Sequence, residues 1–168
     1  MKLSSLLLAA GAALFAISCS TTKTYTIMPK SGTETQGTVM FTQKGKNVTM
    51  DLNAYKLKPN STHAAHIHEF GDCSATDGSS AGGHWNPTSQ SHGKWGAMEH
   101  HAGDLGNLKT NADGTARMVM TTDKWCIGCN DASKNLVGKS IIIHAQADDF
   151  KTQPTGNAGG RVGCVEIK

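Results

Sequence analysis

The chain has 168 residues, enough for one domain with a sizeable core, and a formal net charge of +3. This charge is too small to indicate nucleic acid or an acidic membrane surface as a partner. With 19 glycines, 5% aromatic residues and no sustained helical periodicity, the sequence favours a loop-rich all-β protein.

Residues 1–18 have the pattern of an export signal, which is removed and takes no part in the fold. Lys2 supplies a positive start, and Leu6–Ile17 is an apolar run too short to span a bilayer. The segment AISC, ending at Cys19, resembles the cleavage box of bacterial lipoproteins, in which the cysteine is lipidated and becomes residue one. Because Ala16 replaces the commonest leucine, plain secretion stays open as the alternative.

Both readings export the protein, to the periplasm or to the outer membrane of a Gram-negative-type bacterium. Ser20 after the cysteine favours outer-membrane sorting by analogy with lipoproteins. A lipid anchor at Cys19 is then the only membrane contact that the sequence predicts.

After the signal, residues 19–24 are predicted to be a short lipidated tether, and residues 25–168 form the single domain. Lys46–Ala54 is the clearest strand, because Val48, Met50 and Leu52 alternate with polar residues. Seven strands separated by turn-rich segments are expected in all, and seven or eight short strands favour a sandwich or barrel. They span Tyr25–Pro29, Gln36–Gln43, Lys46–Ala54, Thr62–His68, Thr115–Thr122, Ser140–Ala147 and Arg161–Ile167.

The stretch from His63 to Asp104 holds seven of the eight histidines. His66 and His68 flank one apolar residue, so on a strand both imidazoles leave the same face. About forty residues with little regular structure are unusual in a compact domain unless something orders them. Imidazoles, a carboxylate and a cysteine are what a metal site and a disulfide need. The Gly- and Ser-rich part of this stretch carries His84, His92, His101 and Asp104.

Apart from Cys19, four cysteines remain, an even number suited to an oxidising compartment, and their spacing alone allows three pairings. Cys126 and Cys129 follow Trp125 in a Trp-Cys-x-x-Cys pattern like that of a thioredoxin active site. That site needs a strand-to-helix context, which this sequence lacks. Half of a zinc site would lack a second ligand pair, and a small local disulfide is the plainer interpretation.

Six motifs stand in the order found in copper,zinc superoxide dismutases: HIHEFGD, GGHWNP, SHG, HHAGDL, IIIHAQADD and GNAGGRVGC. The resemblance covers nearly everything after residue 24. It implies an eight-stranded Greek-key β-barrel, an immunoglobulin-like sandwich, with two long functional loops. It also implies dismutation of superoxide to oxygen and hydrogen peroxide, by a monomer or a homodimer. The alternatives are a dismutase-like copper-binding or copper-delivery lipoprotein without turnover, and a catalytically idle structural domain.

By matched motif positions, the resemblance assigns two ligand sets that share His84 as a bridge between the metals. Imidazole suits both copper and zinc, and three nitrogens with one carboxylate suit a structural zinc ion. His63 and His100 match no ligand position and are expected to be hydrogen-bonded and solvent-facing, respectively. The copper ligands implied are His66, His68, His84 and His144, and the zinc ligands implied are His84, His92, His101 and Asp104.

The resemblance also implies roles beyond the metal ligands. Asp148 resembles a carboxylate that joins a copper-ligand and a zinc-ligand histidine by hydrogen bonds, which fixes their tautomers. Arg161 resembles an arginine that guides the anion to copper, so it is predicted, with His84, to be catalytic. The family's disulfide implies pairing of Cys73 with Cys164, which leaves Cys126 with Cys129.

Overall fold

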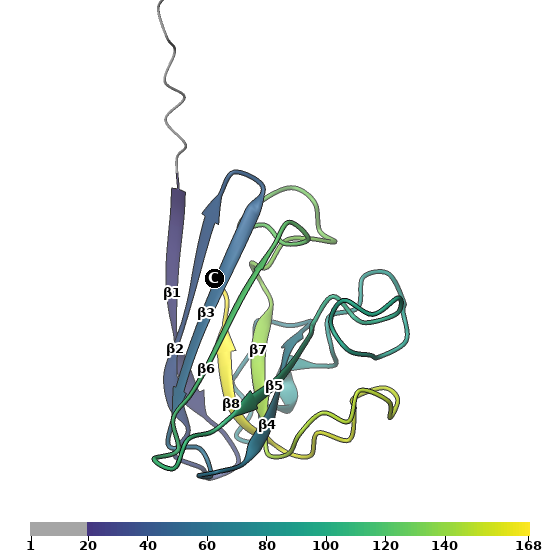
Figure 1. The fold of residues 1–168 in the computed structure, drawn as a ribbon. Coiled ribbons are helices and arrows are strands. Elements are labelled where there is room, and N and C mark those ends of the chain that lie inside the picture. The colour runs from purple at the N-terminus through teal and green to yellow at the C-terminus, as the bar shows by residue number, and fades with distance from the viewer. Residues whose placement is uncertain (1–19) are drawn as a thin grey trace, which may run out of the picture.

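The computed structural model describes residues 20–168, so the predicted signal segment and Cys19 lie outside the described residues. In that part of the chain, eight β-strands and one three-residue 3₁₀-helix form (Figure 1). No helix among residues 20–168 is long and apolar enough to cross a membrane. The elements are β1 (Ser20–Pro29), β2 (Gln36–Lys44), β3 (Asn47–Tyr55), β4 (Thr62–His68), η1 (Ser79–Ala81), β5 (Asp104–Lys109), β6 (Ala116–Thr122), β7 (Ser140–His144) and β8 (Arg161–Glu166).

The strands pair antiparallel in the order β5-β4-β7-β8-β1-β2-β3-β6. Strand β1 joins the two halves, because Ser20 to Ile27 pair with β2 whereas Met28 and Pro29 pair with β8. The halves face each other as a nearly closed barrel (Figure 1). β1, β2 and β3 are consecutive neighbours, and the chain then crosses between the halves, which is a Greek-key pattern. The prediction of an all-β, eight-stranded barrel is confirmed.

Alternation along the strands places the core between the two halves. Val48, Met50 and Leu52 of β3 are fully buried, as the sequence pattern predicted. They pack in one cluster with Ile67 of β4 and Ile141 of β7, among others. The residues that alternate with Ile67 on β4 are His66 and His68, so the imidazoles lie on the outer face of this half.

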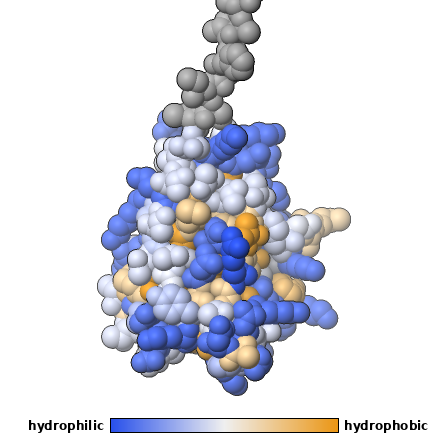
Figure 2. All heavy atoms as spheres, turned by 60° about the vertical axis from the view of Figure 1, so that its left-hand side comes forward, coloured by the Kyte–Doolittle hydropathy of each residue, from blue (hydrophilic) through white to orange (hydrophobic). Residues whose placement is uncertain are grey.

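Two long loops cover that outer face: residues 69–103, called here the long loop, and residues 145–160, called the C-terminal loop (Figure 1). The disulfide between Cys73 and Cys164 ties the long loop to β8, as predicted. Both sulfurs are buried with Ala81 and Ile142 in a small cluster of their own. The outer face of the other half is open to solvent, and Figure 2 shows hydrophilic side chains with only scattered hydrophobic ones on the β1 side.

The structure corrects two expectations about secondary structure. Residues 20–24, predicted as a tether, form the first half of β1, because their backbone pairs with the far end of β2 from Lys44 to Met40. Residues 104–109, which none of the seven predicted strands includes, form β5 beside β4. Gly106 interrupts the alternation between the buried Leu105 and Leu108, which hid this strand from the sequence pattern.

Candidate metal centre

The long loop is attached to β4 by main-chain hydrogen bonds that bring its histidines to the strand. The N–H of Ile67 donates to the carbonyl of Gly103 at 2.8 Å, and the N–H of Trp85 donates to the carbonyl of Ile67 at 2.8 Å. A Cβ at position 103 would lie 2.2 Å from that same carbonyl oxygen, so only glycine allows this approach. As a result His84 forms an isolated β-bridge with His68.

Four histidines from three segments meet on the outer face of β4 and β7. Each offers a ring nitrogen, and these nitrogens lie within 4.8 Å of one another. The four are buried, with exposed fractions of 8% or less. This four-histidine group consists of His66, His68, His84 and His144, the residues predicted to bind copper.

The second ring nitrogen of three of these histidines is held by an oxygen acceptor, which fixes the tautomer. His68 Nδ1 donates to the carbonyl of Gly82 at 2.9 Å, and His144 Nδ1 donates to the carbonyl of Gly159 at 3.2 Å. His66 Nε2 donates to Asp148 Oδ2 at 2.9 Å. The lone pair of each of these rings therefore lies on the other nitrogen.

The ring nitrogens of the four-histidine group that make no hydrogen bond within the described part of the chain are suited to bind a metal ion. A buried polar atom without a partner costs about 1–3 kcal/mol, and neutral imidazole nitrogens are common metal ligands. The buried ring nitrogens that lack a hydrogen-bond partner among the described residues, and that converge here, are His66 Nδ1, His68 Nε2, His84 Nε2 and His144 Nε2.

A second group lies beside the first and shares His84 with it. This Asp104 group contains His84, His92, His101 and Asp104, the residues predicted to bind zinc. The Nδ1 atoms of the three histidines lie 2.9, 3.0 and 3.3 Å from Asp104 Oδ1. Ligands of a tetrahedral zinc ion lie roughly 3.3 Å apart. His92 Nδ1 lies 3.0 Å from Asp104 Oδ1 but makes no hydrogen bond among the described residues.

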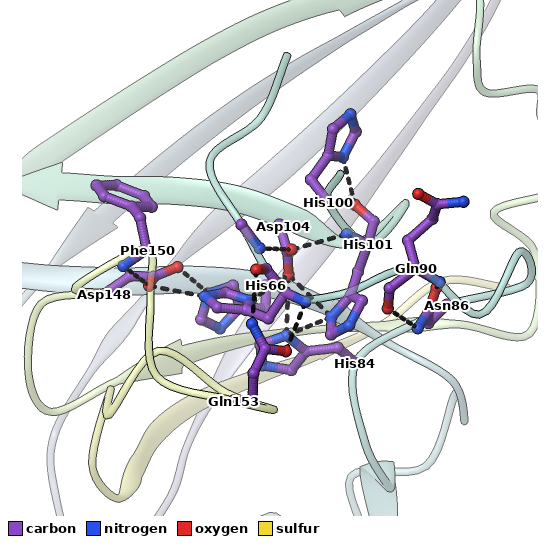
Figure 3. Close-up of polar contacts among 12 residues, drawn as sticks. His66, His84, Asn86, Gln90, His100, His101, Asp104, Asp148, Phe150 and Gln153 are labelled. Atoms are coloured by element: carbon purple, nitrogen blue, oxygen red, sulfur yellow. Dashed lines mark hydrogen bonds and ion pairs between the residues drawn. The ribbon is translucent and has the colours of Figure 1, made fainter. Parts of the chain in front are cut away.

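Asp104 is oriented by backbone donors, so that one oxygen faces the group. Its Oδ2 accepts the N–H of His101 at 2.8 Å and the N–H of Gly93 at 3.0 Å (Figure 3). Burial alone would raise the pKa of Asp104, but the side chains of His101, His84 and His92, followed by the N–H of Gly93, hold that pKa well below its usual range. The carboxylate is therefore ionised and places Oδ1 toward the histidines.

Asp148, at the start of the C-terminal loop, joins the two groups. Its Oδ2 accepts from His66 Nε2 and its Oδ1 accepts from His92 Nε2, both at 2.9 Å (Figure 3). Phe150 N–H donates to Oδ1 at 2.7 Å. Burial would raise the pKa of Asp148, but these hydrogen bonds lower it. One carboxylate thus bonds to one histidine of each group, which is the arrangement that the family resemblance implies for Asp148.

Two amide side chains that the sequence analysis did not single out hold this arrangement in place. Asn107 Oδ1 accepts the N–H of Asp148 at 2.8 Å, and its Nδ2 donates to the Asp148 carbonyl at 2.9 Å. Gln153 makes the same pair of bonds with the backbone of His92, at 2.8 and 2.9 Å. No spacing rule marks these residues, because each acts on a segment far away in the chain.

The histidines that match no ligand position lie outside both groups. His63 Nδ1 donates to the carbonyl of His144 at 2.8 Å, the structural role predicted for it. His100 Nδ1 donates to the carbonyl of His101 at 2.8 Å, and its ring contacts Trp95. His100 is therefore only half exposed, whereas the sequence predicted a solvent-facing side chain.

Burial and charge give the histidines different proton affinities. Burial lowers the pKa of His84 to about 4 and that of His144 to about 3, so both rings are neutral near pH 7. For His92, burial acts in the same direction, but the carboxylates of Asp104 and Asp148 outweigh it and raise the pKa to about 9.

Arg161, at the start of β8, lies beside the four-histidine group. Its Nη1 donates to the carbonyl of Gly78 at 2.6 Å, and its Nη2 donates to the carbonyl of Gly82 at 2.7 Å. The Gly82 carbonyl also accepts from His68, so one oxygen contacts both the arginine and a histidine of the group. A guanidinium has five N–H donors, and the remaining three make no hydrogen bond to residues 20–168, so they can bind an anion.

Comparisons with known proteins agree with this geometry. A family model described as copper/zinc superoxide dismutase (SODC) matches residues 35–167. Superoxide dismutase (Cu-Zn) 1 of Aquifex aeolicus (strain VF5) is 34% identical over 150 residues, which are 87% of this chain and 88% of that protein. The superoxide dismutase-like protein YojM of Bacillus subtilis (strain 168) is 38% identical over 122 residues, 71% of this chain and 62% of that protein's length. A crystal structure of a SOD-like protein from Bacillus subtilis aligns with a TM-score of 0.76 at 32% identity, over 86% of this chain and 97% of that one.

Proposed function

The chain belongs to the copper/zinc superoxide dismutase family, and on that premise we propose that it converts superoxide into oxygen and hydrogen peroxide. Two superoxide anions and two protons give one molecule of each product. Copper occupies the four-histidine group and zinc occupies the Asp104 group. The observation that carries this proposal is the convergence of four buried, unpaired imidazole nitrogens beside a second group that shares His84.

When bound, copper supplies one-electron exchange with superoxide, and zinc supplies positive charge and a fixed geometry. The chain supplies orientation. His68, His144 and His66 are each held at their second nitrogen by Gly82, Gly159 or Asp148. Their lone pairs therefore stay aimed at one point without a change in the protein during turnover.

His84 is the residue that holds and moves a proton. Its Nδ1 lies in the Asp104 group and its Nε2 lies in the four-histidine group. His84 is the one ring of that group whose second nitrogen faces the Asp104 group, where it bonds to Asp104 Oδ1 at 2.9 Å, whereas the second nitrogens of the other three rings bond to Gly82, Gly159 and Asp148. We therefore place the proton that peroxide needs on His84 Nε2, where the ring can accept it and release it again.

Arg161 binds and orients the anion. Its two bonds to loop carbonyls fix the plane of the guanidinium next to His68 without neutralising its charge. A fixed cation beside the histidines that would hold copper raises the local anion concentration and offers hydrogen bonds to the incoming oxygen atoms.

We propose further that the protein works in the cell envelope, held by a lipid at Cys19. The export-signal pattern of residues 1–18 supports this location. All four cysteines among residues 20–168 are in disulfides, which are typical of oxidising compartments. Cys19→Ser should abolish partition of the protein into detergent, and a wild-type mature protein with an unmodified amino terminus would rule out the anchor.

A second candidate is copper binding without turnover. This candidate is retained because the Bacillus relative is named a superoxide dismutase-like protein and not a superoxide dismutase. This chain retains both complete ligand groups and Arg161, which turnover requires and simple copper storage does not.

The two functions separate in one experiment. Superoxide decay is followed with protein loaded with copper and zinc, with protein loaded with zinc alone, and with metal-free protein, after the metals in each sample have been counted. We expect acceleration only in the sample that contains copper. A protein with one bound copper per chain that leaves the decay at the buffer rate would establish copper binding without turnover.

A further inference from the structure

A line of aromatic rings leads from the Asp104 group to the loop between β6 and β7, and the proposed function makes no use of it. His100, next to the ligand His101, has its ring centroid 5.0 Å from that of Trp95. The ring of Trp95 in turn lies 5.2 Å from that of Trp125, in a tilted geometry. Trp125 is 1% exposed and belongs to the barrel core.

The loop that carries Trp125, residues 123–139, is fastened next to this ring. Cys126 forms a disulfide with Cys129, as the sequence predicted. The N–H of Cys126 donates to the carbonyl of Lys134 at 2.9 Å, and the Cys126 carbonyl accepts from Leu136 at 3.0 Å. The two hydrogen bonds fix the backbone immediately after Trp125 to the return half of the same loop, and the disulfide closes the turn between residues 126 and 129.

The position of the Trp125 ring is set by packing. Its Nε1 is buried and has no hydrogen-bond partner among the described residues, so no polar contact anchors the ring. The other contact to Trp95 from this loop is the ammonium of Lys124, 5.5 Å above the ring. Beside these rings a pocket of about 330 Å³ separates the two loops, and it is lined by His100 and Lys134, among others. The Trp95–Trp125 contact is therefore the aromatic connection between the two loops on this side of the pocket, while Gly71 N–H bonds to the Gly138 carbonyl at 2.7 Å elsewhere.

On the Trp95 side of the Trp95–Trp125 contact, hydrogen bonds connect His100 to the proposed zinc ligands His101 and Asp104. His100 Nδ1 is bonded to the carbonyl of His101, whose N–H is bonded to Asp104 Oδ2 at 2.8 Å. His101 Nδ1 lies 3.3 Å from Asp104 Oδ1 and 3.3 Å from His84 Nδ1. If the ring of Trp95 loses its support, His100 and the backbone of His101 are free to move away from this group.

We propose that Trp125, held by the Cys126–Cys129 disulfide, is a positioning residue for the Asp104 group, acting through Trp95 and His100 on His101. This inference rests on the assignment of zinc to that group. A tilted aromatic pair stabilises beyond the area that it buries, and its loss corresponds to zinc release on the order of tenfold faster. An ordinary core tryptophan would affect global stability but leave zinc release unchanged.

The test uses the full protein loaded with copper and zinc. The variants are Trp125→Leu, Trp125→Phe, and Cys126→Ser with Cys129→Ser. The matched control is Phe41→Leu, a fully buried aromatic residue on β2 whose ring contacts Tyr25. Two quantities are measured for each folded protein, well below its melting temperature: the rates of zinc and copper release to a chelator, and the visible spectrum with Co²⁺ in place of zinc.

We expect Trp125→Leu and the double serine variant to release zinc about tenfold faster, with a changed Co²⁺ spectrum and unchanged copper release. Trp125→Phe should stay near wild type because a ring remains. Phe41→Leu should melt lower but release zinc at the wild-type rate. If Trp125→Leu does not fold, the double serine variant decides the question, and wild-type zinc release from it then overturns the proposal.

Zinc release from Trp125→Leu no faster than from Phe41→Leu would overturn the proposal, as would equal acceleration of zinc and copper release. If Trp125→Leu releases zinc faster but the double serine variant releases it at the wild-type rate, the Cys126–Cys129 disulfide has no part in holding Trp125. Failure of the proposed function looks different, because then the wild-type protein itself holds no zinc or does not accelerate superoxide decay.

Discussion

Arg161 illustrates how a single side chain can be tested apart from the metals. Its guanidinium is held by the carbonyls of Gly78 and Gly82, and it coordinates no metal in our account. Arg161→Ala should lower the dismutase rate several-fold with both metals still bound. Arg161→Lys should lose less, because the charge survives although the planar set of donors is gone.

Salt separates steering from a general loss of structure. Screening acts over about 8–10 Å at physiological ionic strength, so the wild-type rate should fall as salt rises. In Arg161→Ala this dependence should flatten. Steady-state rates at low and high salt, with copper occupancy measured first, provide the comparison. An alanine variant with full copper and an unchanged low-salt rate would contradict steering.

The neighbours His100 and His101 offer a matched pair for the zinc assignment. His101 Nδ1 lies in the Asp104 group, whereas His100 points away from it toward Trp95. His101→Ala should lose most of the zinc, measured as metal content after dialysis, and His100→Ala should retain it. The opposite pattern would mean that the neighbouring imidazole is the ligand.

The proton affinity of His92 predicts how zinc binding depends on pH. In the metal-free protein the carboxylates of Asp104 and Asp148 hold its pKa at about 9, so near pH 7 both ring nitrogens carry protons. Zinc must displace the proton on Nδ1. Zinc affinity should therefore rise as pH increases toward 9, and binding at pH 7 should release about one proton from this ring. A titration in weakly buffered indicator that detects no proton release would contradict this assignment.

Among the elements, the C-terminal loop has the sharpest steric requirement. Gly156 has φ +66°, and a Cβ there would lie 1.9 Å from Asp148 Oδ1 and 2.6 Å from His92 Nε2. Gly156→Ala should therefore displace the carboxylate that joins the two groups and lower zinc retention. Gly160→Ala is the control, since a Cβ at that position meets nothing within 4 Å. Equal zinc retention in the two variants, measured against a chelator, would show that the Asp148 bridge is dispensable.

The elements also show where sequence reasoning succeeds and where it stops. Strand β3 was predicted from Val48, Met50 and Leu52 because one of its faces is buried and the other is wet. β5 was missed because Gly106 breaks that alternation, and residues 20–24 were missed because their strand exists only through pairing with β2. Strand pairing between distant segments leaves no local signal in either case.

The same contrast applies to the centre itself. His66 and His68 were identifiable because a strand of period two places both on one face. The family resemblance supplied the remaining ligands, which the structure brings together in two groups. Asn107 and Gln153 could not be identified, because their backbone partners at residues 148 and 92 are neighbours only in the folded chain.

At the scale of the whole molecule, the two halves of the barrel have different tasks. One half presents to solvent an outer face of hydrophilic and neutral side chains with scattered hydrophobic ones (Figure 2). The other carries His66, His68 and His144 on strands, where the packed core beneath them limits their movement. The long loop adds His84, His92 and His101, the start of β5 adds Asp104, and the C-terminal loop adds Asp148. The four-histidine group therefore rests mainly on strands, and the Asp104 group mainly on the long loop.

The most direct test of this account is to locate each metal in the loaded protein. Anomalous diffraction recorded on both sides of the copper and zinc absorption edges distinguishes the two metals atom by atom. We predict one copper among His66, His68, His84 and His144, and one zinc among His84, His92, His101 and Asp104, with His84 between them. A single metal type in both groups, or an empty four-histidine group in protein that accelerates superoxide decay, would contradict it.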